Sequence, residues 1–223
     1  MSHIVIFFLL FVAPALSLVL ALLGLETLNK NLLGWVLLIS GIAYPAGVII
    51  VYWFQKRIFW KGNGEAIKED VGDRSFWAIL PGMLLSFFAS PLEYMYLARL
   101  PHMFWIEIFG LILVLVGIVL LVWARRFIKG MYSGHIEVVS NHKLILSGPY
   151  HYVRHPSYAG FLLTALGIAV GYESIIGMLA IPLLLLPGLA YRIRVEENLL
   201  QEHFGDEFRA YARRVKKLIP GIW

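Results

Sequence analysis

The sequence predicts an all-α integral membrane protein, and composition, apolar runs and charge placement are the observations that predict it. Of the 223 residues, 60% are hydrophobic and only 15% are charged, whereas soluble domains carry about 25% charged residues. The apolar residues gather into about six runs that approach the ~20 residues a helix needs to cross a bilayer. The chain has no cysteine, which excludes disulfides, cysteine-ligated metals and a thiol nucleophile.

Each apolar run predicts one transmembrane helix. The fifth run is short for a full span, and only Tyr172 and Glu173 separate it from the sixth, so these two form a tight helical hairpin. The first run follows no basic residue, unlike a signal peptide, and we interpret it as a retained span. The predicted helices cover residues 4–24, 33–54, 76–97, 104–124, 158–171 and 174–191.

The basic residues test this arrangement. With six spans, 17 of the 19 lysines and arginines fall on one side, and only Lys30 and Arg99 fall on the other. The positive-inside rule makes the basic side cytoplasmic and places both termini there. We expect the inner membrane of a prokaryote or the endoplasmic reticulum of a eukaryote.

Hydropathy and charge suggest a division of the chain near residue 75. Residues 1–75 form an N-terminal transmembrane hairpin with a cytoplasmic loop, in which we expect 55–75 to be a solvated loop or an interfacial helix. Residues 76–223 form the core, in which polar residues concentrate in two cytoplasmic pieces, residues 125–156 and 192–223. Each piece is 32 residues long, and loops of that length in a compact protein are usually functional. The core consists of transmembrane helices, a loop at 129–156, the hairpin at 157–191 and a C-terminal helix at 192–217.

The first cytoplasmic piece ends at a helix start. Pro156 suits the first turn of a helix, so His155 lies at the cytoplasmic mouth of the fifth span, beside free backbone N–H groups. A helix start of this kind attracts a carboxylate or a phosphate. Arg154 adds a planar fork of donors beside it.

The second cytoplasmic piece begins with Arg192 and Glu196, which lie four residues apart and share a helix face. Further on, Gly205 is expected to end one helix and Asp206 to cap the next. Apolar residues recur at helical spacing along this piece, at Leu200, Phe204, Phe208, Tyr211 and Val215. This apolar stripe predicts that residues 206–217 form an amphipathic helix lying on the membrane surface.

Other polar residues carry weaker signals. His135, His142, His151 and His155 are close in sequence, but the paired histidine blocks of membrane di-iron oxygenases are missing, and we predict no metal site. No Rossmann or P-loop motif occurs, so a nucleotide-like cofactor needs a site built from the membrane-edge loops.

Two acidic residues lie near the ends of predicted spans. A carboxylate inside a membrane is a candidate functional group. For Glu93 and Glu107, a carboxyl that simply reaches the bilayer interface is at least as good an interpretation.

Two longer motifs carry a family resemblance. The first is His142-x-Leu144-x-x-x-Gly148-x-Tyr150-x-x-x-Arg154-His155-Pro156-x-Tyr158-x-Gly160. The second is Arg192-x-x-x-Glu196-Glu197-x-x-Leu200-x-x-x-Phe204-Gly205-x-Glu207-Phe208-x-x-Tyr211. Together they resemble the isoprenylcysteine carboxyl methyltransferase family of integral membrane enzymes, over about residues 105–220.

The resemblance implies a cofactor, S-adenosylmethionine, and a set of residues that hold it. It also implies that Arg192 faces the carboxylate of the acceptor, with Arg154 as a supporting cation. The implied cofactor residues are His142, Lys143, Leu144 and Ile145, largely through their backbone, and Tyr150, His155, Pro156, Ser157, Tyr158 and Glu196.

The expected function is methyl transfer to a lipid-like acceptor that enters from the bilayer, foremost the carboxylate of an isoprenylcysteine-type substrate. A carboxylate is already a nucleophile at neutral pH, so the reaction needs positioning and a cation rather than a general base. Three alternatives remain open: an NADPH-dependent sterol or polyprenoid reductase, a methyltransferase acting on a phospholipid amine or a small thiol, and a non-catalytic membrane subunit or transporter. No nucleic-acid partner is expected.

Overall fold

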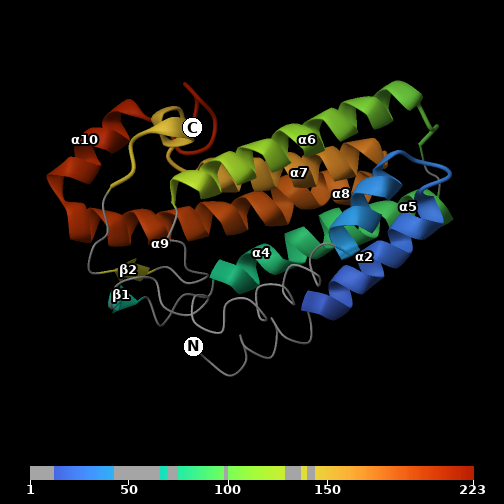
Figure 1. Ribbon diagram of the computed structural model, residues 1–223, viewed down its shortest axis with the longest axis horizontal. Coiled ribbons are helices and arrows are strands. Elements are labelled where there is room, and N and C mark those ends of the chain that lie inside the picture. The colour runs from blue at the N-terminus through green and yellow to red at the C-terminus, as the bar shows by residue number, and fades with distance from the viewer. Residues whose placement is uncertain (1–12, 43–65, 70–74, 98–99, 129–136, 140–143) are drawn as a thin grey trace.

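The computed structural model describes residues 13–42, 66–69, 75–97, 100–128, 137–139 and 144–223. Helices dominate these residues, as predicted (Figure 1). The α-helices are α2 (Ala13–Thr27), an unlabelled helix Leu33–Ile42, α4 (Ser75–Leu84), α5 (Ser90–Tyr96), α6 (Phe104–Phe127), α7 (Pro156–Gly171), α8 (Ile175–Ala180), α9 (Leu186–Phe204) and α10 (Asp206–Arg214). Two π-helical turns, η2 (Leu85–Ala89) and η4 (Ile181–Leu185), join α4 to α5 and α8 to α9, and a 3₁₀ turn, η3, covers Gly148–His151.

Every predicted apolar run contains an apolar helix. Three helices are long and apolar enough to cross a membrane, namely Trp77–Tyr96, Phe104–Phe127 and Ile175–Phe204. Three shorter apolar helices, Leu18–Thr27, Leu33–Ile42 and Pro156–Gly171, account for the other runs. The first two runs extend beyond the described residues, so the count of six spans stays a prediction.

Helices α6 and α7 lie side by side and share more contacts than any other pair of described elements (Figure 1). Small residues allow their backbones to approach closely. A Cβ atom on Gly110 would lie 2.4 Å from the Cα atom of Gly171, and one on Gly117 would lie 2.6 Å from the carbonyl oxygen of Gly160. Larger residues at these positions would push the two helices apart.

The predicted helical hairpin is confirmed. Helix α7 ends at Gly171, and α8 begins at Ile175 after a short turn in which the Ser174 hydroxyl accepts a hydrogen bond from the Gly177 N–H at 2.8 Å. Helix then continues through α8, η4 and α9 as far as Phe204. The sixth apolar run therefore passes directly into the charged helix that follows it, as predicted.

The turns at one end of the bundle are tied together by buried polar groups. The Asn31 side-chain amide donates to the Gly171 carbonyl at 2.8 Å, and the Tyr94 hydroxyl donates to the Lys30 carbonyl at 2.7 Å. These bonds hold the turn at Lys30 beside the α7–α8 turn. The end of α9 and the C-terminal residues lie at the opposite end of the molecule (Figure 1).

The two acidic residues near span ends belong to this set of contacts. Glu93 is 3% exposed and accepts hydrogen bonds from the Ser174 hydroxyl at 2.6 Å and the Ile176 N–H at 2.9 Å. Glu107 is 8% exposed and accepts from the Leu32 N–H at 3.5 Å. The interpretation of both carboxyls as simply reaching the bilayer interface is therefore wrong, because they bind backbone N–H groups of neighbouring turns.

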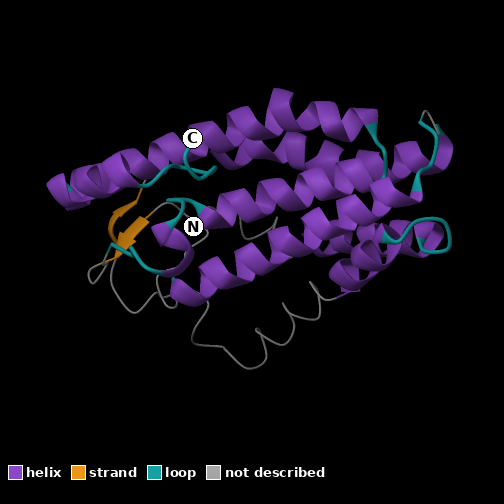
Figure 2. Ribbon diagram, turned by 90° about the horizontal axis from the view of Figure 1, so that it is seen from above, coloured by secondary structure: helices purple, strands orange, loops and turns teal. Residues whose placement is uncertain are grey.

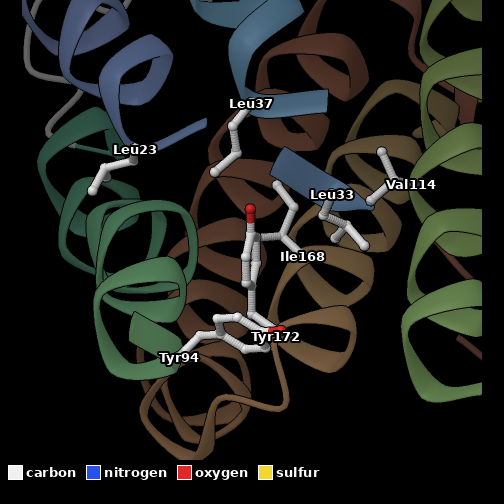
Figure 3. Packing of buried hydrophobic residues seen from close by; sticks show 7 residues of the cluster. All are labelled: Leu23, Leu33, Leu37, Tyr94, Val114, Ile168 and Tyr172. Carbon is white, nitrogen blue, oxygen red and sulfur yellow. The ribbon is translucent and has the colours of Figure 1, made fainter. Parts of the chain in front are cut away.

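The N-terminal helices share a core with the rest of the bundle. Tyr172 lies at the centre of this core, and its hydroxyl is 3.0 Å from that of Thr27 (Figure 3). The division predicted near residue 75 stays a prediction, but the described helices on both sides of it pack together. The core residues are Leu23, Leu33, Leu37, Tyr94, Val114, Ile168 and Tyr172.

A two-stranded antiparallel sheet is the one sheet in the described residues (Figure 2). Strand β1 (Ala66–Glu69) pairs with β2 (Glu137–Val139), with Ala66 opposite Val139 and Glu69 opposite Glu137. The expected loop or interfacial helix at 55–75 is thus wrong over β1. Because the two strands are distant in sequence, no local pattern indicates the pairing. The sheet therefore joins a segment that precedes α4 to one that follows α6.

Candidate active site

The site is built on the chain that enters α7. Gly148 opens η3 with φ +63°, and a Cβ atom there would lie 2.5 Å from the Phe127 ring, so both conformation and space favour glycine. Pro156 is the first residue of α7 and His155 occupies its N-cap position. The predicted helix start at Pro156 is confirmed, and His155, 5% exposed, lies at it.

Tyr158 links two charged residues of α9, Arg192 and Glu196. Its hydroxyl donates to Glu196 Oε2 at 2.8 Å and accepts from Arg192 Nε at 2.8 Å. The His155 ring stacks on the Tyr158 ring with centroids 5.6 Å apart, and His155 Nδ1 is 3.8 Å from Glu196 Oε2. The structure therefore brings together His155, Tyr158, Arg192 and Glu196 from two motifs.

Arg154 binds the next residue along α9, Glu197, and connects this helix to α10. Its side chain is 8% exposed, and Nε and Nη2 lie 2.8 Å and 2.7 Å from Glu197 Oε1. Its Nη1 donates to the Ala212 carbonyl at 2.9 Å and also to the Val215 carbonyl. The guanidinium thus binds α9 and the end of α10, rather than lying beside Arg192.

Glu197 is a residue whose role the sequence did not indicate. Besides Arg154, its carboxylate binds His155 Nε2 at 3.0 Å and Lys217 Nζ at 3.3 Å. A carboxylate only accepts, so His155 Nε2 carries the proton in this bond. His155 and Arg154 precede Glu197 by 42 and 43 residues, which is why helical spacing could not reveal these contacts.

Helix α10 packs on the site instead of on a membrane surface. Phe208 and Tyr211 are 3% and 6% exposed, and the Tyr211 hydroxyl donates to the Tyr150 carbonyl at 2.6 Å. Burial raises the pKa of Tyr211 to about 12. The expected contact of this apolar face with the bilayer is therefore wrong. Gly205, with φ +53°, does break the helix as predicted, and it occupies the cap position expected for Asp206.

The remaining predicted cofactor residues lead into this site. Leu144 and Ile145 are half-buried just before η3, whereas His142 and Lys143 lie outside the described residues. The Ser157 hydroxyl is buried and has no hydrogen-bond partner within the described part of the chain. Such a group costs about 1–3 kcal/mol, and a bound polar molecule would relieve this cost.

No group of three histidine, aspartate or glutamate side chains suited to a metal occurs among the residues that the structure describes. His151 is exposed in η3 and His155 is buried before α7. No continuous helix joins these two histidines.

Fold and site together define an integral membrane protein with a polar site at one end of its helical bundle. Residues 105–207 match the family described as Phospholipid methyltransferase. The chain is 32% identical to protein-S-isoprenylcysteine O-methyltransferase B of Arabidopsis thaliana, over 63% of this chain and 72% of the relative. It is 30% identical to the human protein-S-isoprenylcysteine O-methyltransferase, over 62% of this chain and 50% of the relative.

A solved structure, the eukaryotic intramembrane Ras methyltransferase ICMT, has the same fold, with a TM-score of 0.60 and 23% identity over 93% of this chain and 75% of that one. The chain belongs to the protein-S-isoprenylcysteine O-methyltransferase family and is a membrane methyltransferase. This confirms the family resemblance of the two motifs. It also sets aside the reductase and the non-catalytic subunit as alternatives.

Proposed function

We propose that this protein transfers a methyl group from S-adenosylmethionine to the carboxylate of an isoprenylcysteine-type acceptor that enters from the bilayer. One observation carries the proposal. A single phenol, Tyr158, hydrogen-bonds both a cation, Arg192, and an anion, Glu196, at the end of the bundle where the apolar helix becomes charged. A site for a positively charged donor and a negatively charged acceptor needs both signs at close range.

The residues around Glu196 suit S-adenosylmethionine. The cofactor supplies an electrophilic methyl group on a positively charged sulfur. Glu196, whose side chain is 32% exposed, offers a carboxylate to that positive charge or to the amino-acid ammonium group. The Ser157 hydroxyl, buried without a described partner, offers a further polar contact. The proposed pocket is completed by Leu144, Ile145, Tyr150, His155, Pro156 and Tyr158 and, outside the described residues, by His142 and Lys143.

Arg192 suits the acceptor. A carboxylate needs no general base, and the task of the protein is to fix the angle at which it attacks the methyl group. A guanidinium can bind a carboxylate through two parallel hydrogen bonds. Tyr158 holds Arg192 in place through Nε. Arg154, which we expected to support it, is assigned instead to positioning, because its nitrogens bind Glu197 and two carbonyls.

A phospholipid amine is the second candidate acceptor, because the matching family is described as Phospholipid methyltransferase. The two acceptors differ in charge and in proton chemistry. An ammonium group must lose a proton before it can attack and is repelled by Arg192, whereas a carboxylate is ready to attack and is attracted.

The test is methyl transfer by protein purified in detergent, with labelled S-adenosylmethionine and one acceptor at a time. We expect transfer to N-acetyl-S-farnesylcysteine and none to its methyl ester, which lacks the free carboxylate. Transfer to monomethyl-phosphatidylethanolamine but not to the farnesylcysteine would replace the carboxylate acceptor by the amine. Calorimetry with S-adenosylhomocysteine would show cofactor-site binding independently of the acceptor.

A further inference from the structure

The residues after α10 turn back and run beside the segment that enters α7. Val153 and Lys216 form a parallel β-bridge. The Arg154 N–H donates to the Lys216 carbonyl at 2.8 Å, and the His155 N–H donates to the Lys217 carbonyl at 3.0 Å. These bonds satisfy the backbone donors just ahead of Pro156 and hold the start of α7 in one position.

The segment Lys217–Trp223, which we call the strap, is then anchored by apolar packing. Leu218 is 4% exposed and packs with Ala159 and Ile193, and Trp223 packs against the same group. The N–H groups of Leu218 and Ile219 both donate to the Trp223 carbonyl at 2.7 Å, which closes the strap into a compact turn. Leu218 and Trp223 therefore attach the strap to the bundle end, whereas residues 219–222 are exposed.

Lys217 connects the strap to the polar site. Its Nζ lies 3.3 Å from Glu197 Oε2, whereas Arg154 and His155 both bind Oε1. Contacts on both oxygens fix the rotation of the carboxylate about its terminal bond. That rotation decides where Oε1 lies, and so where the His155 ring is held.

The position of the His155 ring in turn affects the residues assigned to the acceptor and the cofactor. Its ring stacks on Tyr158, at 5.6 Å between centroids with 21° between planes. Tyr158 in turn binds Arg192 and Glu196, each at 2.8 Å. A path of direct contacts thus leads from Lys217 through Glu197, His155 and Tyr158 to the residues assigned to acceptor and cofactor.

We propose that Lys217 is a positioning residue for methyl transfer, which acts by fixing the Glu197 carboxylate and thereby the His155 and Tyr158 rings of the cofactor pocket. This proposal rests on the proposed function, because it assumes that those rings line the pocket for S-adenosylmethionine. A purely structural Lys217 would only help to hold the strap on the bundle. The two roles differ in whether cofactor affinity or only stability responds to its loss.

The test compares Lys217→Gln with Lys216→Gln. Both variants lose one positive charge at neighbouring positions and keep the backbone bonds, but the Lys216 side chain is exposed and the Lys217 side chain contacts Glu197. For each variant, the Kd of S-adenosylhomocysteine is measured by calorimetry, KM for both substrates and kcat by methyl transfer, and Tm by thermal unfolding.

We expect Lys217→Gln to weaken S-adenosylhomocysteine binding and to raise KM for the cofactor by about fivefold, since the ion pair with Glu197 is lost. Lys216→Gln should stay within about twofold of the wild type, and Lys217→Arg, which retains a cation, should recover most of the loss.

The results separate the two proposals. A lower Tm for Lys217→Gln with cofactor Kd and KM equal to those of Lys216→Gln would overturn the positioning role and leave a structural one. Failure of the wild type to bind S-adenosylhomocysteine would instead overturn the proposed function. If the wild type binds S-adenosylhomocysteine and the two glutamine variants have the same Kd, KM, kcat and Tm, only the positioning role of Lys217 is overturned.

Discussion

Tyr158 is the residue that sets the positions of the two charged side chains in this site. Its hydroxyl lies between Arg192 and Glu196 and binds both. From their spacing along α9 alone, Arg192 and Glu196 would be expected to form an ordinary ion pair. An exposed i, i+4 pair contributes only about 0.3–0.5 kcal/mol. With the Tyr158 hydroxyl between them, Arg192 and Glu196 can each orient the rest of the charged group toward a ligand.

Glu196→Gln should weaken binding of S-adenosylmethionine about tenfold or more, because a hydrogen bond to a charged group contributes ~1.5–3 kcal/mol. Calorimetry on the folded variant measures this. Glu202→Gln, an exposed position on the same helix, is the charge-matched control and should leave affinity within about twofold. Unchanged affinity of Glu196→Gln would reduce Glu196 to a partner of Tyr158 with no role toward the cofactor.

Arg192→Lys should lower kcat while nearly preserving cofactor affinity. Lysine keeps the charge but lacks the fork that orients a carboxylate, and it lacks the Nε donor that Tyr158 accepts. Turnover is measured with N-acetyl-S-farnesylcysteine at saturating cofactor. Arg194→Lys, an exposed arginine two residues away, should be nearly silent. Turnover of Arg192→Lys within a few-fold of wild type would remove the carboxylate-orienting role.

Helix α10 is the element whose environment is least evident from its own sequence. Its amphipathic pattern suits a membrane surface, yet its buried residues pack on the protein, and Tyr211 binds the Tyr150 carbonyl at 2.6 Å. The Arg154 guanidinium also binds the carbonyl of Ala212 within it. Helix α10 therefore holds η3 and the segment that enters α7 in place. Loss of one of these contacts should lower the free energy of unfolding.

Tyr211→Phe should destabilise the protein by about 1–3 kcal/mol, because the buried Tyr150 carbonyl loses its donor. Thermal unfolding measures this, with Tyr191→Phe at an exposed tyrosine as the control. A Tm equal to that of the control would show that α10 is not held by this bond.

The same residue predicts a pH dependence. Burial raises the pKa of Tyr211 from 10.0 to about 12, so the folded protein holds the phenol proton more tightly than the unfolded chain. The stabilisation is fully present below pH 10 and is lost as pH rises toward 12. Wild-type Tm should therefore fall more steeply than that of Tyr211→Phe between these pH values. Parallel curves would contradict the assignment.

The whole molecule has two polar ends with different tasks. At one end, Asn31, Glu93 and Glu107 bind neighbouring turns together. At the other, residues from α7, α9, α10 and the strap form the site. The proposed cofactor site thus lies at the end of the bundle that carries the C-terminal lysines and arginines, and the positive-inside rule predicts that this end faces the cytoplasm.

Reporter fusions at residue 30 and residue 223 should therefore report opposite sides of the membrane, with residue 223 cytoplasmic. The motivation is the predicted division of 17 of 19 basic residues onto one side, together with the position of the turn that follows α2 and of the C-terminal end at opposite ends of the bundle (Figure 1). A further fusion at residue 205 should agree with that at residue 223. The same side for residues 30 and 223 would contradict the six-span topology.

Features that depend on local pattern can be predicted from the amino-acid sequence alone. Apolar runs of helical length predict the spans, Pro156 predicts the start of α7, and the short turn after Gly171 predicts the hairpin. The two motifs also indicated which residues would meet, and His155, Tyr158, Arg192 and Glu196 do.

Contacts between residues distant in the chain depend on how the helices pack, and no local pattern predicts them. The pairing of β1 with β2, the burial of Glu93 and Glu107, and the docking of α10 on η3 each join segments with no shared periodicity. The same holds for Glu197, whose partners Arg154, His155 and Lys217 come from two other segments. The physical reason is that helical spacing reports which side chains share a face, whereas the partner of a buried charge is chosen by how the helices pack.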